Sequence, residues 1–238
     1  MELILTGTTA ARLVLPRQLS WPDITALREA VNGVGAPVLT LEGRDGVFCE
    51  GGDAGPAAAV APRPQEFAAL LRALETAPFA VVALVDGAAL GAGLGLAAAS
   101  DVVVATARAR FGLPETFLGL LPAMVFPAVA RRIGPGRARR LALGGPSLTA
   151  EEALAHGLVD EIADDIEAAR ERVCRRLERL SPPAVQALKR LVGAHFGTTA
   201  AYESDAAAEL LERLASADAR ERLRRFADGG TPWPDDGA

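Results

Sequence analysis

Short apolar runs in the first half of the chain have the length and composition of β-strands. We expect strands at 2–6, 12–15, 37–42, 79–85 and 102–105, the first two forming a hairpin, and a short extended segment at 158–162. Brief apolar runs bounded by turn-forming residues are typical of buried strands. The strands at 79–85 and 102–105 flank a glycine-rich stretch, which makes residues 86–122 the centre of the predicted architecture.

Apolar residues spaced three and four positions apart predict helices between and after these strands. The expected helices cover 20–31, 65–76, 128–132, 137–143, 149–157, 165–180, 183–196 and 200–226, with a shorter helical run that ends near residue 99. Ser20 and Thr149 are residue types that cap helix N-termini. Because strands and helices alternate first and helices alone follow, the sequence predicts an α/β core followed by an all-helical C-terminal part.

Two of the predicted strands run into glycine-rich loops. The strand at 37–42 leads into GRDGVFCEGGD at 43–53, and the strand at 79–85 leads into a loop that contains Gly91, Ala92 and Gly93. Small residues leave backbone N–H groups open, and one N–H from each loop could converge on a single carbonyl oxygen. This is the requirement of an oxyanion hole that stabilises an enolate. The Ala- and Pro-rich segment 55–64 is expected to be mobile.

Glu115 is the candidate for acid–base chemistry. It follows the second glycine-rich loop and lies among Phe111, Leu113, Phe117 and Leu118. Burial among such neighbours raises the pKa of a carboxyl toward the range useful at neutral pH. The alternative is a structural acid that complements the first turn of a helix.

Composition and charge exclude several classes of function. The chain has 238 residues and a formal net charge of −5, with no basic tract beyond the arginines at 131–140, so nucleic-acid binding is not expected. No apolar run is long enough to cross a membrane, and the N-terminus does not resemble a signal peptide. The two cysteines, Cys49 and Cys174, fit no metal-ligand spacing, so we expect no metal and a reduced cytoplasmic location.

Five segments, in order, resemble the crotonase (enoyl-CoA hydratase/isomerase) superfamily. They are VFCEGGD at 47–53, VDGAALGAGLGLAAASDVVVA at 85–105, ARFGLPETFLGLLP at 109–122, RRIG at 131–134 and LTAEEALAHGLVDEI at 148–162. The resemblance implies a repeated ββα core over 1–180 and a helical region over 181–238 that assembles a homo-trimer or a pair of trimers. It also implies an acyl-thioester substrate whose enolate is held by the N–H groups of Gly52 and Ala92.

The chain departs from this family at one catalytic position. The family's hydratases carry two glutamates, and the resemblance places one at Glu115 and the other at position 95, where this chain has Gly95. We expect Glu115 to be catalytic, and Gly95, Leu118, Met124 and Phe126 to form the acyl pocket. Gly95 either leaves room for a branched acyl group or lets its helix pack closely. The segment that binds the CoA nucleotide in the family is replaced here by LVLPRQLSWPD.

Within the family, the segments around 100–134 and 224–236 are most similar to polyketide β-branching dehydratases. This resemblance implies dehydration of a 3-hydroxyacyl group of the 3-hydroxy-3-methylglutaryl type on an acyl carrier protein. The substrate then arrives as a carrier-protein or CoA thioester, and no separate cofactor is expected. Arg137 and Arg140 are the expected contacts with an acidic carrier, although an ordinary solvated face is the simpler interpretation of these arginines.

Three alternatives remain at the level of the sequence. A Δ3–Δ2 enoyl isomerase needs only one carboxylate to move a proton between carbons, and a hydratase with a single catalytic glutamate is related to it. A decarboxylase of a glutaconyl-type thioester is disfavoured because Lys189 is the only lysine and lies far from the glycine loops. A non-catalytic binding subunit is also compatible with the loss of the second glutamate.

Overall fold

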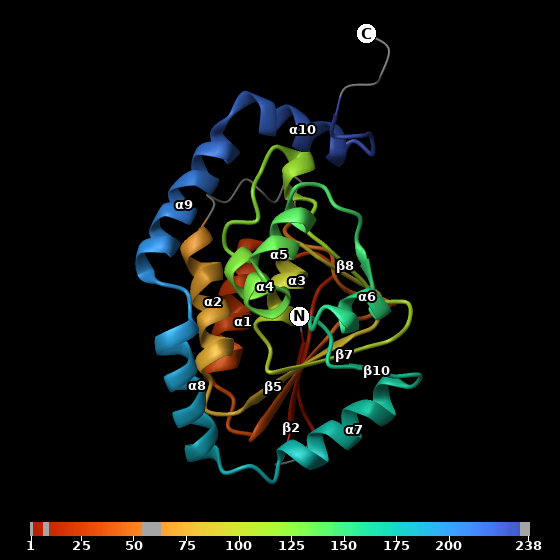
Figure 1. The fold of residues 1–238 in the computed structure, drawn as a ribbon, viewed down its shortest axis with the longest axis vertical. Helices are drawn as coiled ribbons and strands as arrows, with labels where there is room; N and C mark the ends of the chain where they lie inside the picture. The colour runs from red at the N-terminus through yellow and green to blue at the C-terminus, as the bar shows by residue number, and fades with distance from the viewer. Residues whose placement is uncertain (1, 7–9, 54–62, 234–238) are drawn as a thin grey trace.

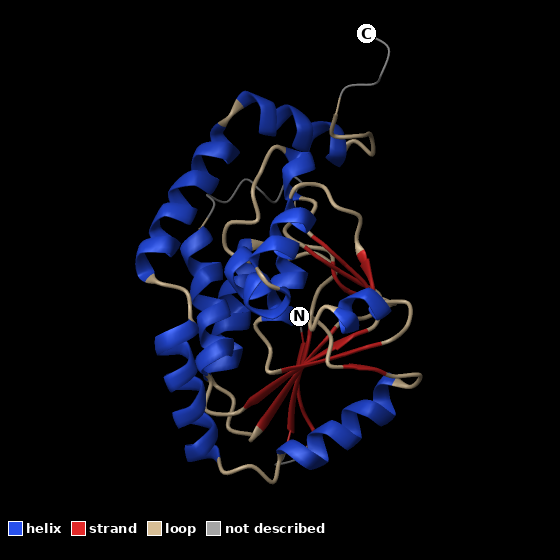
Figure 2. Ribbon diagram, viewed as in Figure 1, coloured by secondary structure: helices blue, strands red, loops and turns tan. Residues whose placement is uncertain are grey.

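The computed structural model describes residues 2–6, 10–53 and 63–233. Its larger sheet contains six strands in the order β1 (Glu2–Thr6), β2 (Ala10–Val14), β3 (Val38–Glu42), β5 (Ala80–Val85), β7 (Val102–Ala105) and β10 (Glu161–Ile162). The hairpin partner β1 runs antiparallel to β2, and all the other neighbours are parallel. Figure 2 shows this sheet in red, with helices above and below it. The predicted hairpin and the predicted strands are confirmed.

A smaller sheet contains β4 (Val47–Cys49), β6 (Ala88–Leu90), β8 (Arg110–Gly112) and β9 (Leu148–Thr149). Each of β4, β6 and β8 directly follows a strand of the larger sheet and precedes a helix, respectively α2 (Pro64–Thr76), α3 (Ala92–Ala98) and α4 (Phe126–Ile133). The ββα unit therefore occurs three times, which confirms the expected α/β fold. The three short strands were not predicted individually, because each lies within a stretch interpreted as a loop.

The predicted capping residues begin their helices. Helix α1 (Trp21–Asn32) starts with a capping box in which Ser20 and Asp23 bond each other's backbone N–H, and Thr149 and Glu152 do the same for α6 (Ala150–Ala155). Asp165 accepts hydrogen bonds from two N–H groups at the start of α7 (Ile166–Leu177). These side chains satisfy donors that a helix N-terminus leaves without an internal partner.

The C-terminal part is helical, as expected, but it contains one more break than the sequence analysis predicted. Helices α8 (Pro182–Phe196), α9 (Ala200–Ala215) and α10 (Ala217–Ala227) follow one another along one side and over one end of the core (Figure 1). The single helix expected at 200–226 is wrong, because Ser216 is extended and its hydroxyl caps α10 by accepting from the N–H of Ala219. The break turns α10 across the end of the core.

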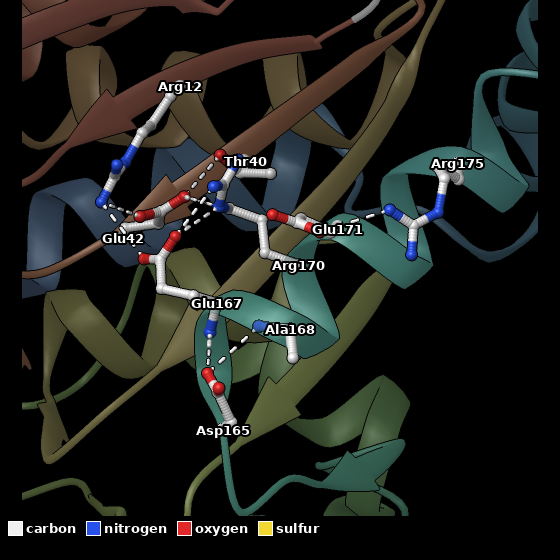
Figure 3. Close-up of polar contacts among 9 residues, drawn as sticks. All are labelled: Arg12, Thr40, Glu42, Asp165, Glu167, Ala168, Arg170, Glu171 and Arg175. Carbon is white, nitrogen blue, oxygen red and sulfur yellow. Dashed lines mark hydrogen bonds and ion pairs between the residues drawn. The ribbon is translucent and has the colours of Figure 1, made fainter.

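Two apolar layers cover the larger sheet. The main core lies between this sheet, the smaller sheet and helices α1 to α5 (α5, Pro135–Ala142), and a second cluster lies between the sheet and α7. A polar group of side chains borders the second cluster (Figure 3). There the buried Glu42 accepts from Thr40 at 2.8 Å and pairs with Arg12 at 2.6 Å, while Arg170 of α7 binds Glu167. None of the helices in the described residues is long and apolar enough to cross a membrane.

Candidate active site

The two glycine-rich loops predicted to converge do lie against each other. A methyl group placed on Gly51 would be 3.4 Å from the carbonyl oxygen of Leu90 and 3.8 Å from the nitrogen of Ala92. Gly51 also has a φ of 105°, a conformation that side-chain-bearing residues rarely adopt. Glycine at this position therefore allows the first loop to approach the start of α3 closely.

The N–H of Gly52 is free to face the space between the loops. Leu19 donates to the oxygen of Gly51 at 2.8 Å and accepts from the N–H of Asp53 at 2.9 Å, so it pairs with both neighbours of Gly52. In such a parallel bridge the N–H and C=O of the middle residue point the other way. Within the described residues, no acceptor is bound to the Gly52 N–H.

Ala92 contributes the corresponding group from the second loop. It is the first residue of α3, where backbone N–H groups have no acceptor inside the helix. The preceding Gly91 donates to the oxygen of Gly112 at 2.9 Å and has a φ of 51°, which fixes the turn into the helix. Gly52 and Ala92 both line one cavity. The structure thus brings together the two residues that were predicted to form an oxyanion hole.

Glu115 lies beside these loops, at the start of the short 3-10 helix η2 (Glu115–Leu118). A methyl group on Gly91 would be 3.0 Å from its Oε1 atom, so the glycine gives the carboxyl its room. The Oε2 atom is buried and has no hydrogen-bond partner among the described residues. Burial raises the pKa of Glu115 from 4.5 to about 7. A carboxyl with this pKa can both take and give a proton near neutral pH.

The cavity that contains these groups has a volume of about 620 Å³. Most of its wall is apolar and comes from the segments at 19–24, 67 and 117–125, and it includes Leu118 and Met124 of the predicted acyl pocket. The C-terminal helices close it with Leu210, Leu214, Leu223 and Phe226, and Trp233 follows them. The sequence analysis assigned the helical region that contains these leucines to contacts between subunits. Their spacing on one helical face was the signal that something apolar would cover them.

Two members of the predicted acyl pocket do not line this cavity. A methyl group on Gly95 would lie 2.4 Å from Cγ1 of Val125 and 3.7 Å from the Phe67 ring, and both of these side chains line the cavity themselves. Val125 therefore fills the space that the missing side chain was expected to leave, and the close-packing interpretation of Gly95 holds. Phe126 packs partly buried against the main core instead.

Other candidate side chains have partners that explain them. Glu50 accepts two hydrogen bonds from Arg17, at 2.7 and 3.0 Å. Cys49 is buried, and burial raises the pKa of its thiol to about 11, which leaves almost no thiolate for nucleophilic chemistry. Lys189 is buried, donates to the carbonyls of Leu74 and Phe79, and pairs with Asp101 at 2.6 Å.

The arginine cluster divides into two groups. Arg131 pairs with Glu75, and Arg132 donates to the carbonyls of Ala98 and Ser100, so these two are occupied within the chain. Arg137 and Arg140, the predicted carrier contacts, are exposed on α5. Across the part of the chain that the structure describes, no three His, Cys, Asp or Glu side chains gather as metal ligands.

The sequence profile of the enoyl-CoA hydratase/isomerase family matches residues 23–235, nearly the whole chain. The chain belongs to this family. A "Probable enoyl-CoA hydratase" of Rhodobacter capsulatus is 35% identical over 216 residues, which cover 87% of this chain and 83% of the relative. The two proteins are therefore related in sequence over most of both chains.

Two further proteins are similar to this chain in sequence or in structure. The bacillaene synthase dehydratase PksH of Bacillus subtilis is 27% identical over 206 residues, covering 83% of this chain and 80% of that protein. The solved structure of PksH superposes with a TM-score of 0.90 over 98% of both chains at 22% identity, which shows the shared fold. An enoyl-CoA hydratase from Mycobacterium avium subsp. paratuberculosis superposes with a TM-score of 0.88 at 29% identity, over 99% of this chain and 98% of that one.

Proposed function

We propose that this family member is an acyl-thioester hydro-lyase that uses Glu115 as its single catalytic carboxyl. The observation that carries the proposal is the Glu115 carboxyl, whose buried Oε2 atom has no hydrogen-bond partner among the described residues and whose Oε1 atom lies against the loop that bears Ala92. Gly52, Ala92 and Glu115 line the same cavity. Together they supply a proton acceptor and two donors for an oxyanion.

The dehydration follows from these three groups. Ionised Glu115 takes the α-proton of a 3-hydroxyacyl thioester, and the electrons of the C–H bond move into the thioester carbonyl. The N–H groups of Gly52 and Ala92 hold the resulting enolate oxygen, where negative charge develops. The enolate then expels the β-hydroxyl, which leaves as water after it receives the proton from Glu115. Hydration is the same sequence in reverse.

A Δ3–Δ2 enoyl isomerase is the second candidate, and one observation favours it. Val125 packs against Gly95, where the family's second glutamate is expected, so no second carboxyl occupies that position to act with Glu115. Moving a proton between two carbons through a dienolate requires one carboxyl, whereas water addition benefits from a second group that orients the water.

A panel of thioesters separates these functions. Purified protein is incubated with 3-hydroxyacyl, 2-enoyl, 3-enoyl and carboxyacyl thioesters, each on CoA and on an acyl carrier protein. A hydro-lyase interconverts the first two, an isomerase consumes the 3-enoyl compound, and a decarboxylase releases CO₂ from the last. Binding without turnover of any member would support the non-catalytic alternative and contradict the proposal.

An acyl carrier protein is the proposed thioester carrier. The support is the 27% identity to the bacillaene synthase dehydratase together with the position of α5. Helix α5 ends at Ala142, whose carbonyl accepts from Thr116, the residue after Glu115, and it presents Arg137 and Arg140 to solvent. Exposed positive charge on α5 would speed encounter with an acidic carrier.

The carrier proposal predicts a specific loss. Arg137→Glu with Arg140→Glu should lower kcat/KM for a carrier-protein substrate at least tenfold and leave kcat/KM for the matching CoA substrate nearly unchanged, because CoA does not dock on α5. Arg176→Glu with Arg179→Glu changes the charge equally, in the last turn of α7 and just beyond its end, and serves as the control. Equal losses with both carriers would contradict the role of α5.

A further inference from the structure

The lining of the acyl cavity combines apolar side chains with a few acidic and neutral polar ones, and none of the described lining residues is basic. Its charged lining residues are Glu50, Asp53 and Glu115, and no Lys, Arg or His of the described residues lines it. The remaining positions, 1, 7–9, 54–62 and 234–238, contain no Lys, Arg or His in the sequence. Every basic side chain of the chain is therefore placed, and each lies outside the cavity wall.

Two arginines that bond cavity-lining residues are already neutralised by carboxylates. Arg17 binds the carboxylate of Glu50 with two hydrogen bonds, and its side chain is 69% exposed. Arg222 donates to the carbonyl of Phe117 at 3.3 Å and pairs with Asp218 at 2.9 Å. Neither is available as a counter-ion inside the cavity. The other polar lining residues, Gln18 and Ser20, are neutral.

Much of the remaining cavity wall is apolar and comes from two segments. Leu118 and Met124 come from the segment after Glu115, and Leu210, Leu214, Leu223 and Trp233 come from the C-terminal part. An alkyl chain gains from burial against such a wall. A carboxylate would lose its hydration without gaining a cation, because the charged side chains of this lining are all acidic.

We infer that the acyl group taken by this site is uncharged and apolar, and that acyl groups ending in a second carboxylate are rejected. The inference rests on the proposed function and narrows it. It departs from the 3-hydroxy-3-methylglutaryl group expected from the sequence, because that group carries a free carboxylate. Selection arises here from an unpaired charge in the disfavoured complex, not from an extra contact in the favoured one.

Three substrates that differ only at the far end of the acyl chain test the inference. They are trans-2-octenoyl-CoA, its ω-carboxy counterpart trans-2-octenedioyl-CoA, and the ω-methyl ester of the latter. We expect kcat/KM for the carboxylate to be at least a hundredfold below that for the alkyl substrate, with the ester within tenfold of the alkyl substrate. Equal kcat/KM for alkyl and carboxylate substrates would overturn the inference and leave the hydro-lyase assignment intact.

A cation placed in the wall should reverse the preference. Leu214→Arg is expected to raise the carboxylate-to-alkyl ratio of kcat/KM at least tenfold over that of Leu214→Gln, the matched neutral variant. Binding of saturated octanoyl-CoA and octanedioyl-CoA to the parent protein needs neither a variant nor turnover. If no substrate is turned over, the proposed function fails, and tighter binding of octanoyl-CoA still supports the inference. Equal binding of the two overturns it.

Discussion

Glu115 owes its chemistry to burial and not to a neighbouring charge. Loss of water raises its pKa to about 7, whereas an unfolded chain would leave it near 4.5. Because the folded pKa is the higher one, the protonated carboxyl stabilises the fold fully below about pH 4.5. This contribution is lost as the pH rises through about 7. A pKa shift of this size corresponds to about 3 kcal/mol in the free energy of unfolding.

Glu115→Gln should therefore stabilise the protein at alkaline pH. The quantity to compare is the free energy of unfolding of the variant minus that of the parent. This difference should be more favourable to the variant at pH 8 than at pH 5, by up to about 3 kcal/mol, because the amide stays neutral. Urea unfolding at the two pH values measures this. Glu66 has a pKa lowered by its hydrogen bond from Thr25, so its contribution is already complete at both pH values, and Glu66→Gln should show almost no difference between pH 5 and pH 8. A difference for Glu115→Gln that is independent of pH would contradict the assigned pKa.

At the scale of elements, the sequence predicted what depends on local pattern. The apolar runs predicted the strands of the larger sheet, and Ser20, Thr149 and Asp165 begin helices as expected. The pattern did not predict β4, β6 and β8, since a three-residue strand has too few positions to show a period. It also could not reveal that Val125 fills the space beside Gly95, because the two residues meet only through the tertiary packing of α3 and α4.

The packing of α3 against Val125 predicts a coupled pair of substitutions. Gly95→Ala should destabilise the protein by about 1–3 kcal/mol, because the new methyl would lie 2.4 Å from Cγ1 of the buried Val125. In a Val125→Ala background the Cγ1 carbon of Val125 is absent. The double variant should then be at least about 1 kcal/mol more stable than the sum of the two single effects predicts. Additive effects in denaturant unfolding would show that α3 and Val125 do not compete for this space.

At the scale of the whole molecule, the C-terminal helices have two different roles. Helices α9 and α10 fold over the cavity of their own chain, where Tyr202 donates to the carbonyl of Ala123 and Arg213 donates to that of Gly119. Helix α8 is tied to the core by Lys189 but leaves a row of apolar side chains in solvent. These are Leu188, Leu191, Val192 and Phe196, with exposed fractions of 62%, 60%, 46% and 71%. The proposed homo-trimer, or pair of trimers, would use this face of α8 rather than the leucines of α9.

Leu191→Glu with Phe196→Glu should accordingly reduce the mass in solution to that of a monomer. Two charges within this apolar row make its burial between two copies of the chain unfavourable. The helix keeps its contact with the core through Lys189. Arg190→Glu, on the other flank of α8, is the control and should leave the assembly unchanged. Light scattering that shows a monomeric parent protein, or an unaltered oligomer in the double variant, would contradict this interface.

The claim on which the account rests is that Glu115 alone carries the proton. Its most direct test is kcat/KM against pH for the parent and for Glu115→Gln, with Glu171→Gln on the surface of α7 as the control. The parent should gain activity as the pH rises through about 7, since the free enzyme must hold the carboxylate. Glu115→Gln should be at least about a hundredfold slower at every pH, and Glu171→Gln should match the parent. Activity of Glu115→Gln within a few-fold of the parent, with the same pH profile, would contradict the account.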